Sequence, residues 1–128
     1  MSVKRVESIP SEPVPAGTGT KKKVLISSEE GPNFAMRRFE IAPGGSMPNH
    51  TNTVEHEQYV VAGRATVGIG DEVHTVEAGC VVFIPAGVPH WYRTEGDEPF
   101  AFLCLIPNAR RSEPLHRDVP PDEVEIVG

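Results

Sequence analysis

Short apolar stretches separated by turn-forming residues recur through most of this sequence, and their spacing constrains the fold more than any other feature. They follow one another at intervals of about 8–12 residues, as the strands of a sandwich or barrel do. Helical periodicity is absent, and 13 prolines and 12 glycines are many for 128 residues. The pattern predicts an all-β single domain. The predicted strands cover residues 24–26, 34–42, 50–52, 58–61, 64–69, 73–76, 80–84, 88–93 and 100–106.

The two ends of the chain differ from this regular middle. Residues 1–21 are rich in Pro, Gly, Ser and Thr, and we expect an extended arm there with one short edge strand near residues 3–9. Residues 22–108 carry the strand pattern. Residues 109–128 combine prolines with many charges, so we expect an irregular tail, either disordered or lying on a partner subunit.

Composition excludes several function classes. The formal net charge is −6, and the one basic cluster, Lys21–Lys23, is brief, so no nucleic-acid role is expected. No apolar run reaches the ~18 residues of a membrane span. The first ten residues are polar and mixed, unlike a signal peptide, so we expect a cytoplasmic protein in which Cys80 and Cys104 stay reduced.

Three of the five histidines have spacings that suit a metal site. His50 and Asn52 are two residues apart on a predicted strand, so both side chains face the same side. His56 follows four residues later, and His90 follows a distant Gly-Val-Pro bend. Imidazoles converging inside a barrel suit manganese, iron, nickel, copper or zinc. His74 and His116 have no such frame, and we assign both to the surface.

Two longer patterns surround these histidines. The first reads Gly44, five residues, His50, Thr51, Asn52, three residues, His56, six residues, Gly63. The second reads Gly79, five residues, Pro85, Ala86, Gly87, two residues, His90, three residues, Thr94. The chain therefore resembles the cupins, in which both spacings recur, and among them the small single-domain manganese cupins. Shared segments with that group are Val24-Leu25-Ile26, Pro32-Asn33-Phe34, Glu55-His56-Glu57 and Phe102-Leu103-Cys104-Leu105-Ile106-Pro107.

The resemblance implies a double-stranded β-helix, that is, a jelly-roll barrel, over residues 22–108. It also implies one divalent transition metal, manganese or iron first, on His50, Asn52, His56 and His90. Asn52 stands where the family usually has a second histidine. It can ligate through its amide oxygen, hold a metal-bound water, or leave a three-histidine site; a degenerate site without metal is the remaining alternative.

Alternation places further side chains inside the barrel. From His90 it turns Tyr92 inward, and from His56 it turns Gln58 inward and the flanking Glu57 outward. If Arg37 also faces inward, it is a buried cation that needs a partner: a carboxylate or phenolate substrate, an internal Glu, or solvent at the rim. The resemblance places Cys104 in the pocket, although a buried cysteine is often a small core residue. Arg37, Tyr92 and Cys104 are the candidate catalytic residues.

These residues support three functional hypotheses. The first is a metal-dependent oxygenase of the dioxygenase type, acting on a small substrate such as an aromatic compound. The second is an isomerase, lyase or decarboxylase that uses the metal as a Lewis acid. The third is a module that binds a metal or small ligand without turnover. Family members often pair into dimers through exchanged edge strands, so we also expect a homodimer.

Overall fold

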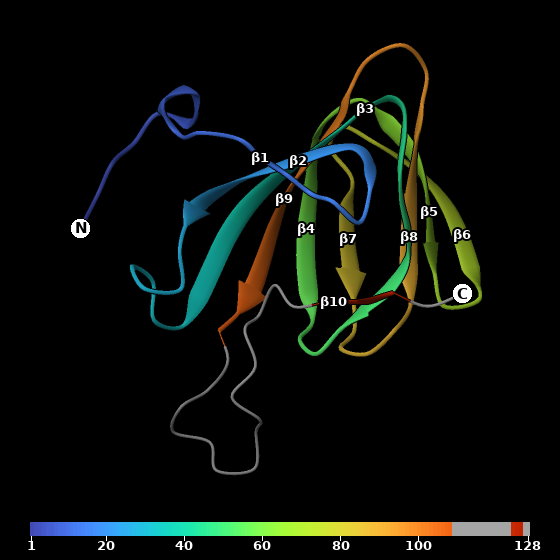
Figure 1. Cartoon of the computed structure of the whole chain (residues 1–128). Coiled ribbons are helices and arrows are strands. Elements are labelled where there is room, and N and C mark those ends of the chain that lie inside the picture. The colour runs from blue at the N-terminus through green and yellow to red at the C-terminus, as the bar shows by residue number, and fades with distance from the viewer. Residues whose placement is uncertain (109–123, 127–128) are drawn as a thin grey trace.

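The computed structural model describes residues 1–108 and 124–126, and these form a curled antiparallel sheet (Figure 1). The predicted all-β jelly roll is confirmed. The elements are η1 (Val6–Ser8), β1 (Glu12–Pro13), β2 (Thr18–Ile26), β3 (Phe34–Asn52), β4 (His56–Ala62), β5 (Arg64–Ile69), β6 (Glu72–Glu77), β7 (Val81–Ile84), β8 (His90–Glu95), β9 (Phe100–Pro107) and β10 (Val124–Ile126).

Strand β3 joins the two halves of the barrel. The strands follow the order β6-β5-β8-β3-β9-β4-β7, and β2 and β10 also pair with β3. The first part of β3, residues 34–41, pairs with β9, whereas Ser46, Met47 and His50 pair with β8. The sequence predicts that one strand ends before Pro43-Gly44-Gly45 and that another begins at residue 50. In the structure a single strand continues through this segment with a bend, where Gly44 has a φ of +79°. One strand therefore contributes side chains to both facing sheets.

Alternation along the strands separates core from surface as predicted. In β4 every second residue from His56 is buried, and β8 and β9 bury His90, Tyr92, Phe102 and Cys104. Aromatic rings fill the middle of the barrel: Tyr92 stacks on Phe102 at 5.1 Å, and Phe39 stacks on the same ring at 5.3 Å, centroid to centroid. Burying such side chains stabilises the fold by roughly 1.5–3 kcal/mol each.

The turn between β4 and β5 requires glycine. Gly63 has a φ of +79°, a region that side chains disfavour, and a Cβ there would collide with the carbonyl oxygen of Pro99. This glycine ends the first of the two sequence patterns, so its place in the pattern has a steric cause. Thr94 ends the second pattern and donates a hydrogen bond from Oγ1 to the Ile41 carbonyl at 3.0 Å, which ties β8 to β3.

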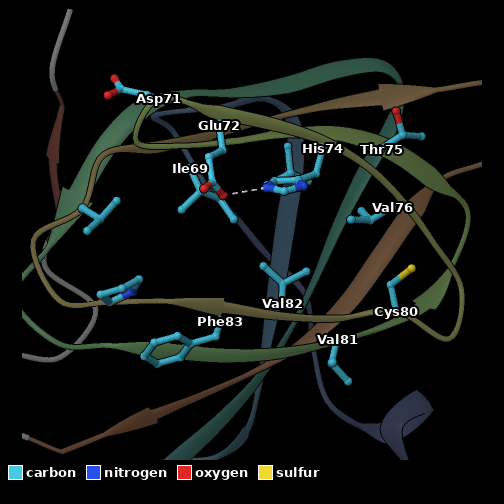
Figure 2. A pocket seen from close by; sticks show the side chains of 13 residues that line it. Ile69, Asp71, Glu72, His74, Thr75, Val76, Cys80, Val81, Val82 and Phe83 are labelled. Carbon is cyan, nitrogen blue, oxygen red and sulfur yellow. Dashed lines mark hydrogen bonds and ion pairs between the residues drawn. The ribbon is translucent and has the colours of Figure 1, made fainter.

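The ends of the strand order, β6 and β7, face each other across a hollow. Its volume is about 620 Å³, and Val76, Val81 and Val82 are among the apolar side chains around it. Figure 2 shows Glu72 and His74 of β6 on one side of the hollow and Phe83 of β7 on the other.

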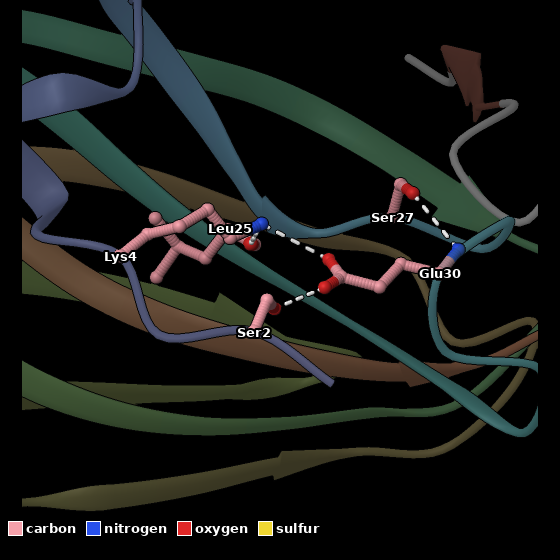
Figure 3. Close-up of polar contacts among 5 residues, drawn as sticks. All are labelled: Ser2, Lys4, Leu25, Ser27 and Glu30. Carbon is pink, nitrogen blue, oxygen red and sulfur yellow. Dashed lines mark hydrogen bonds and ion pairs between the residues drawn. The ribbon is translucent and has the colours of Figure 1, made fainter.

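The N-terminal arm differs from the expected edge strand. Residues 6–8 form the 3-10 helix η1, and the arm's strand is β1, which pairs with β2 of the same chain. Lys4 anchors the arm: its Nζ donates to the Leu25 carbonyl at 3.0 Å and lies 2.9 Å from Glu30 Oε1 (Figure 3). Ser2 also donates a hydrogen bond to the Glu30 carboxylate. Side-chain contacts of this kind explain why a polar segment becomes ordered without continuing the sheet.

The C-terminal tail contains a strand where irregular structure was expected. Strand β10 pairs antiparallel with the end of β3, opposite residues 50–52, while residues 109–123 and 127–128, His116 among them, lie outside the described residues. Cys80 and Cys104 are free thiols, as predicted. No helix in the described parts of the chain has the length and apolar character needed to cross a membrane.

Candidate functional site

His50 and His90 form a cross-strand pair between β3 and β8. Their ring centroids are 4.1 Å apart, and both side chains are buried. His50 Nδ1 lies 2.7 Å from the Pro48 carbonyl oxygen, and His90 Nδ1 lies 3.0 Å from that of Val88. Because a carbonyl oxygen only accepts, each Nδ1 carries the hydrogen and donates it. The Nε2 atom of each ring is therefore left with a lone pair directed away from these backbone contacts.

His56 approaches the same place from the facing sheet. Its ring centroid is 5.5 Å from that of His90, and its Nε2 accepts a hydrogen bond from Asn52 Nδ2 at 2.8 Å. The structure therefore brings together all four residues that the sequence proposed as ligands. Within the described residues, no three His, Cys, Asp or Glu side chains already form a group that would hold a metal ion. The lone pair of His56 Nε2 is taken up by the hydrogen bond from Asn52.

Burial keeps these imidazoles neutral. It lowers the pKa of His56 to about 3, with a further contribution from the Arg37 charge and the other two rings. It lowers the pKa of His90 to about 4, helped by His50, and it lowers the pKa of His50 in the same direction. Neutral imidazole is the form that ligates metal ions, because only then is a nitrogen lone pair available.

Unpartnered polar atoms are concentrated here. Buried polar atoms nearly always have a hydrogen-bond partner, so each exception needs a cause. Four of the five such side-chain atoms in the described residues lie on the inner face of the barrel around this cluster. They are Arg37 Nε, Asn52 Oδ1, His56 Nδ1 and His90 Nε2; the fifth is Asn108 Oδ1. Asn52 Oδ1 and His90 Nε2 offer lone pairs that fit a bound cation, whereas Arg37 Nε carries a hydrogen, as does His56 Nδ1 while its Nε2 accepts from Asn52.

A second polar row runs beside the histidines. Arg37, Cys104 and Gln58 are neighbours across β3, β9 and β4. Arg37 Nη2 lies 3.5 Å from Cys104 Sγ, and Gln58 Nε2 donates to the Tyr92 hydroxyl at 2.7 Å. The sequence placed Gln58 inside but gave it no role. An amide at an inward strand position was the signal, and only the fold shows that Tyr92 is its partner.

The inner cluster contains cationic and neutral groups only. Burial raises the pKa of the Tyr92 hydroxyl far above its ordinary value, and burial likewise raises the pKa of the Cys104 thiol. Both groups therefore keep their protons at neutral pH. Glu55 and Glu57 are exposed, and no Asp or Glu is buried anywhere in the described residues. Neither glutamate orients His56, because His56 Nδ1 has no partner.

The remaining predicted residues lie at the surface and in the interior. His74 is exposed and pairs with Glu72 at 3.0 Å, as expected of a surface histidine. Arg37 is inside, 5% exposed, which excludes the rim. The hollow between β6 and β7 lies next to the site, because its wall residues Ile69 and Val82 are the strand partners of His90 and Gln58. Sequence reasoning missed this space, since it depends on how two distant strand edges meet.

Comparison with known proteins establishes the family. The cupin domain family matches residues 37–106, more than half of the chain, and the protein belongs to that family. A curated relative, 1-methylthio-D-xylulose 5-phosphate methylsulfurylase from Rhodospirillum rubrum, is 32% identical over 93 residues, which cover 73% of this chain. The match covers 58% of that relative, so this chain spans less than two thirds of its length.

Solved structures agree on the fold. The polyketide cyclase RemF from Streptomyces resistomycificus is 28% identical, with a TM-score of 0.82, and the match covers 100% of this chain and 86% of that one. A predicted oxalate decarboxylase from Thermotoga maritima is 23% identical, with a TM-score of 0.75 and coverage of 83% and 98%. The names of these neighbours refer to different activities, so the shared fold does not decide a reaction, which must be argued from the site.

Proposed function

We propose that this protein is a metal-dependent enzyme acting on a small molecule, with one divalent transition-metal ion held by His50, His56 and His90. The observation that carries the proposal is the meeting of three buried, neutral imidazoles from both sheets beside lone pairs that have no protein partner. Manganese and iron come first, and nickel, zinc and copper also accept imidazole.

Asn52 decides how His56 takes part. Its Nδ2 now donates to His56 Nε2, so ligation through that nitrogen requires the amide to release it. Asn52 Oδ1 has no partner and is available as an oxygen ligand or as the acceptor for a bound water. With neutral donors only, the ion would keep its full charge, which makes it a stronger Lewis acid than one bound to a carboxylate.

The reaction we favour is oxygenation. When bound, the ion would supply either redox chemistry toward dioxygen or Lewis acidity toward a carbonyl group. No carboxylate is buried among the described residues, and burial raises the pKa of the Tyr92 hydroxyl and the Cys104 thiol, which makes both poor bases at neutral pH. This favours oxygenation over an isomerase or lyase in which one of these groups removes a proton. A decarboxylase that uses the ion as a Lewis acid needs no such base and is the second candidate.

The inner side chains would bind and orient the substrate. Because Tyr92 accepts a hydrogen bond from Gln58, its own hydroxyl hydrogen is available for a substrate oxygen. The stacked rings of Tyr92, Phe102 and Phe39 provide an apolar wall for an aromatic or aliphatic body.

The test begins with metal analysis of protein purified without chelator and of protein loaded with Mn²⁺ or Fe²⁺. The loaded protein is then given a panel of alkenes, phenols and diketones under air and under nitrogen. We expect one ion per chain and oxygen uptake with at least one substrate. Product formed equally under nitrogen would replace the oxygenase with the Lewis-acid alternative. Failure to retain any ion after loading would overturn the metal-dependent proposal.

We also propose that two copies pair in solution. Four exposed apolar side chains on the outer face of β4 and β7 support this, because contiguous apolar surface is uncommon on monomers: Tyr59, Val61, Val81 and Phe83. Light scattering at micromolar concentration should give the mass of a dimer, and a monomer mass would refute the pairing.

A further inference from the structure

Arg37 is a buried cation for which the described chain offers no anion. It lies on the inner face of β3 with 5% of its surface exposed, and its guanidinium stands 4.9 Å from the centre of the Phe39 ring. Its one hydrogen bond reaches the Cys104 thiol at 3.5 Å, and its Nε has no partner. Within residues 1–108, no carboxylate forms an ion pair with it.

The contrast with other arginines shows that this arrangement is specific to the interior. Arg93 also lies over an aromatic ring, that of Trp91 at 5.6 Å, but its Nε pairs with Glu95 at 3.1 Å. Arg38, the neighbour of Arg37 on the opposite face of β3, pairs with Glu40 at 3.2 Å. A guanidinium carries five donors in a planar fork that matches a carboxylate, and a thiol is a weak substitute.

No group inside the barrel can neutralise Arg37. No Asp or Glu is buried among the described residues, and the polar side chain that Arg37 contacts is the Cys104 thiol, whose pKa burial raises. Gln58 is neutral, and the histidines are neutral or cationic. An isolated buried charge is costly, so a site that retains one is built to receive an opposite charge.

We propose that Arg37 is a substrate-binding residue and that the substrate carries a carboxylate, which the Arg37 fork pairs with inside the barrel. The carboxylate would lie beside the histidine cluster, because Arg37, Cys104 and Gln58 form one cross-strand row and Gln58 is two residues from His56 on β4. The word "substrate" rests on the proposed metal-dependent function, whereas the anion site depends on Arg37 alone.

The experiment uses acetate as the probe and the full-length, metal-free protein. Sodium acetate replaces sodium chloride at constant ionic strength, and acetamide serves as the uncharged isostere. Two readouts are followed: the thermal midpoint and the NMR signal of the arginine Nε–H that disappears in Arg37→Lys. We expect acetate to shift that signal and to raise the midpoint by about 4 °C or more at about ten times its Kd, while acetamide does neither.

Matched variants make the result specific. Arg37→Met should abolish the acetate response and, without acetate, melt no lower than wild type, since it removes an unpaired buried charge. Arg93→Met removes an arginine that also lies on an aromatic ring and should keep the full response. If Arg37→Met does not fold, the wild-type NMR titration decides by itself.

Three outcomes would overturn the proposal. The first is an Arg37 Nε–H signal whose chemical shift is the same in acetate as in chloride. The second is an Arg37→Met variant that folds and keeps the full acetate response. The third is thiolate ultraviolet absorbance at neutral pH that Cys104→Ser removes. Metal loading is measured separately. Acetate binding by a protein that retains no metal would contradict only the proposed metal-dependent function. Metal binding without acetate binding would contradict only the proposed carboxylate substrate.

Discussion

The inner and outer faces of this barrel use the same residue types differently. On the outer face, Arg93 pairs with Glu95, and at the edge of the hollow the exposed His74 pairs with Glu72. On the inner face, Arg37 has no acid, and His90 Nε2 has no partner at all. Surface ion pairs contribute only about 0–1 kcal/mol, and solvent can replace them. Inside, these atoms are buried away from bulk solvent, so those without a partner indicate a place where a ligand would bind.

The comparison separates groups that hold the fold from groups that await a ligand. The aromatic core and the outer ion pairs are complete in the protein alone. The histidine cluster and Arg37 are complete only with an added cation and an added anion. Removing a core side chain or a ligand-binding side chain, or adding the cation, should therefore have different effects.

The largest effect should come from the aromatic core. Phe102 is 3% exposed and stacks on two rings, so Phe102→Ala should lower the free energy of unfolding by about 3–5 kcal/mol. Phe34 is 63% exposed, and Phe34→Ala should change it by no more than about 0.5 kcal/mol. Urea denaturation of both variants measures the difference, and equal losses would mean that the inner face is not the core.

Removing one imidazole should remove the ion. Loss of a group that merely orients a ligand costs about 10–100-fold in metal affinity, so His90→Ala should cost about 100-fold or more. His74→Ala should leave the affinity unchanged, because His74 is exposed and already pairs with Glu72, away from the three buried rings. Elemental analysis after Mn²⁺ loading and desalting provides the measurement. Retention of a full equivalent by His90→Ala would place the ion elsewhere.

Supplying the cation should stabilise the fold. An ion that binds only the folded chain adds about 2.7 kcal/mol when its free concentration is 100 times its Kd. We therefore expect Mn²⁺ or Fe²⁺ to raise the thermal midpoint and a chelator to reverse the change. The same addition to His90→Ala should have little effect, and an equal rise there would attribute the stabilisation to the surface.

The smallest predicted effect tests Asn52. Asn52→His adds a fourth imidazole and should tighten metal binding by about 10-fold, close to 1.4 kcal/mol. Asn52→Ala discriminates between the roles left open by the sequence: unchanged affinity means a three-histidine site, and weaker binding means that the amide oxygen or its water takes part. Competition with a metal-sensitive dye measures both variants. If Asn52→His binds more weakly than wild type, a fourth imidazole does not fit.

Local pattern was sufficient for most strands of the barrel and for which of their side chains face inward, and it proposed the candidate site. The strands predicted over residues 64–69 and 73–76 are β5 and β6, and alternation from His56 and His90 put Gln58 and Tyr92 inside. These features follow from the period of a strand and from turn chemistry, both of which act over a few residues. The spacing of the three histidines likewise indicated one common site.

Only the tertiary structure decided which groups meet and which remain alone. It made β3 continuous through its glycine bend, turned residues 6–8 into η1, and added β10 in the tail. It also placed Asn52 against His56 and left Arg37 without a carboxylate. The physical reason is that partners come from strands far apart in the chain: a residue's own neighbours determine its face, but distant segments determine what it touches.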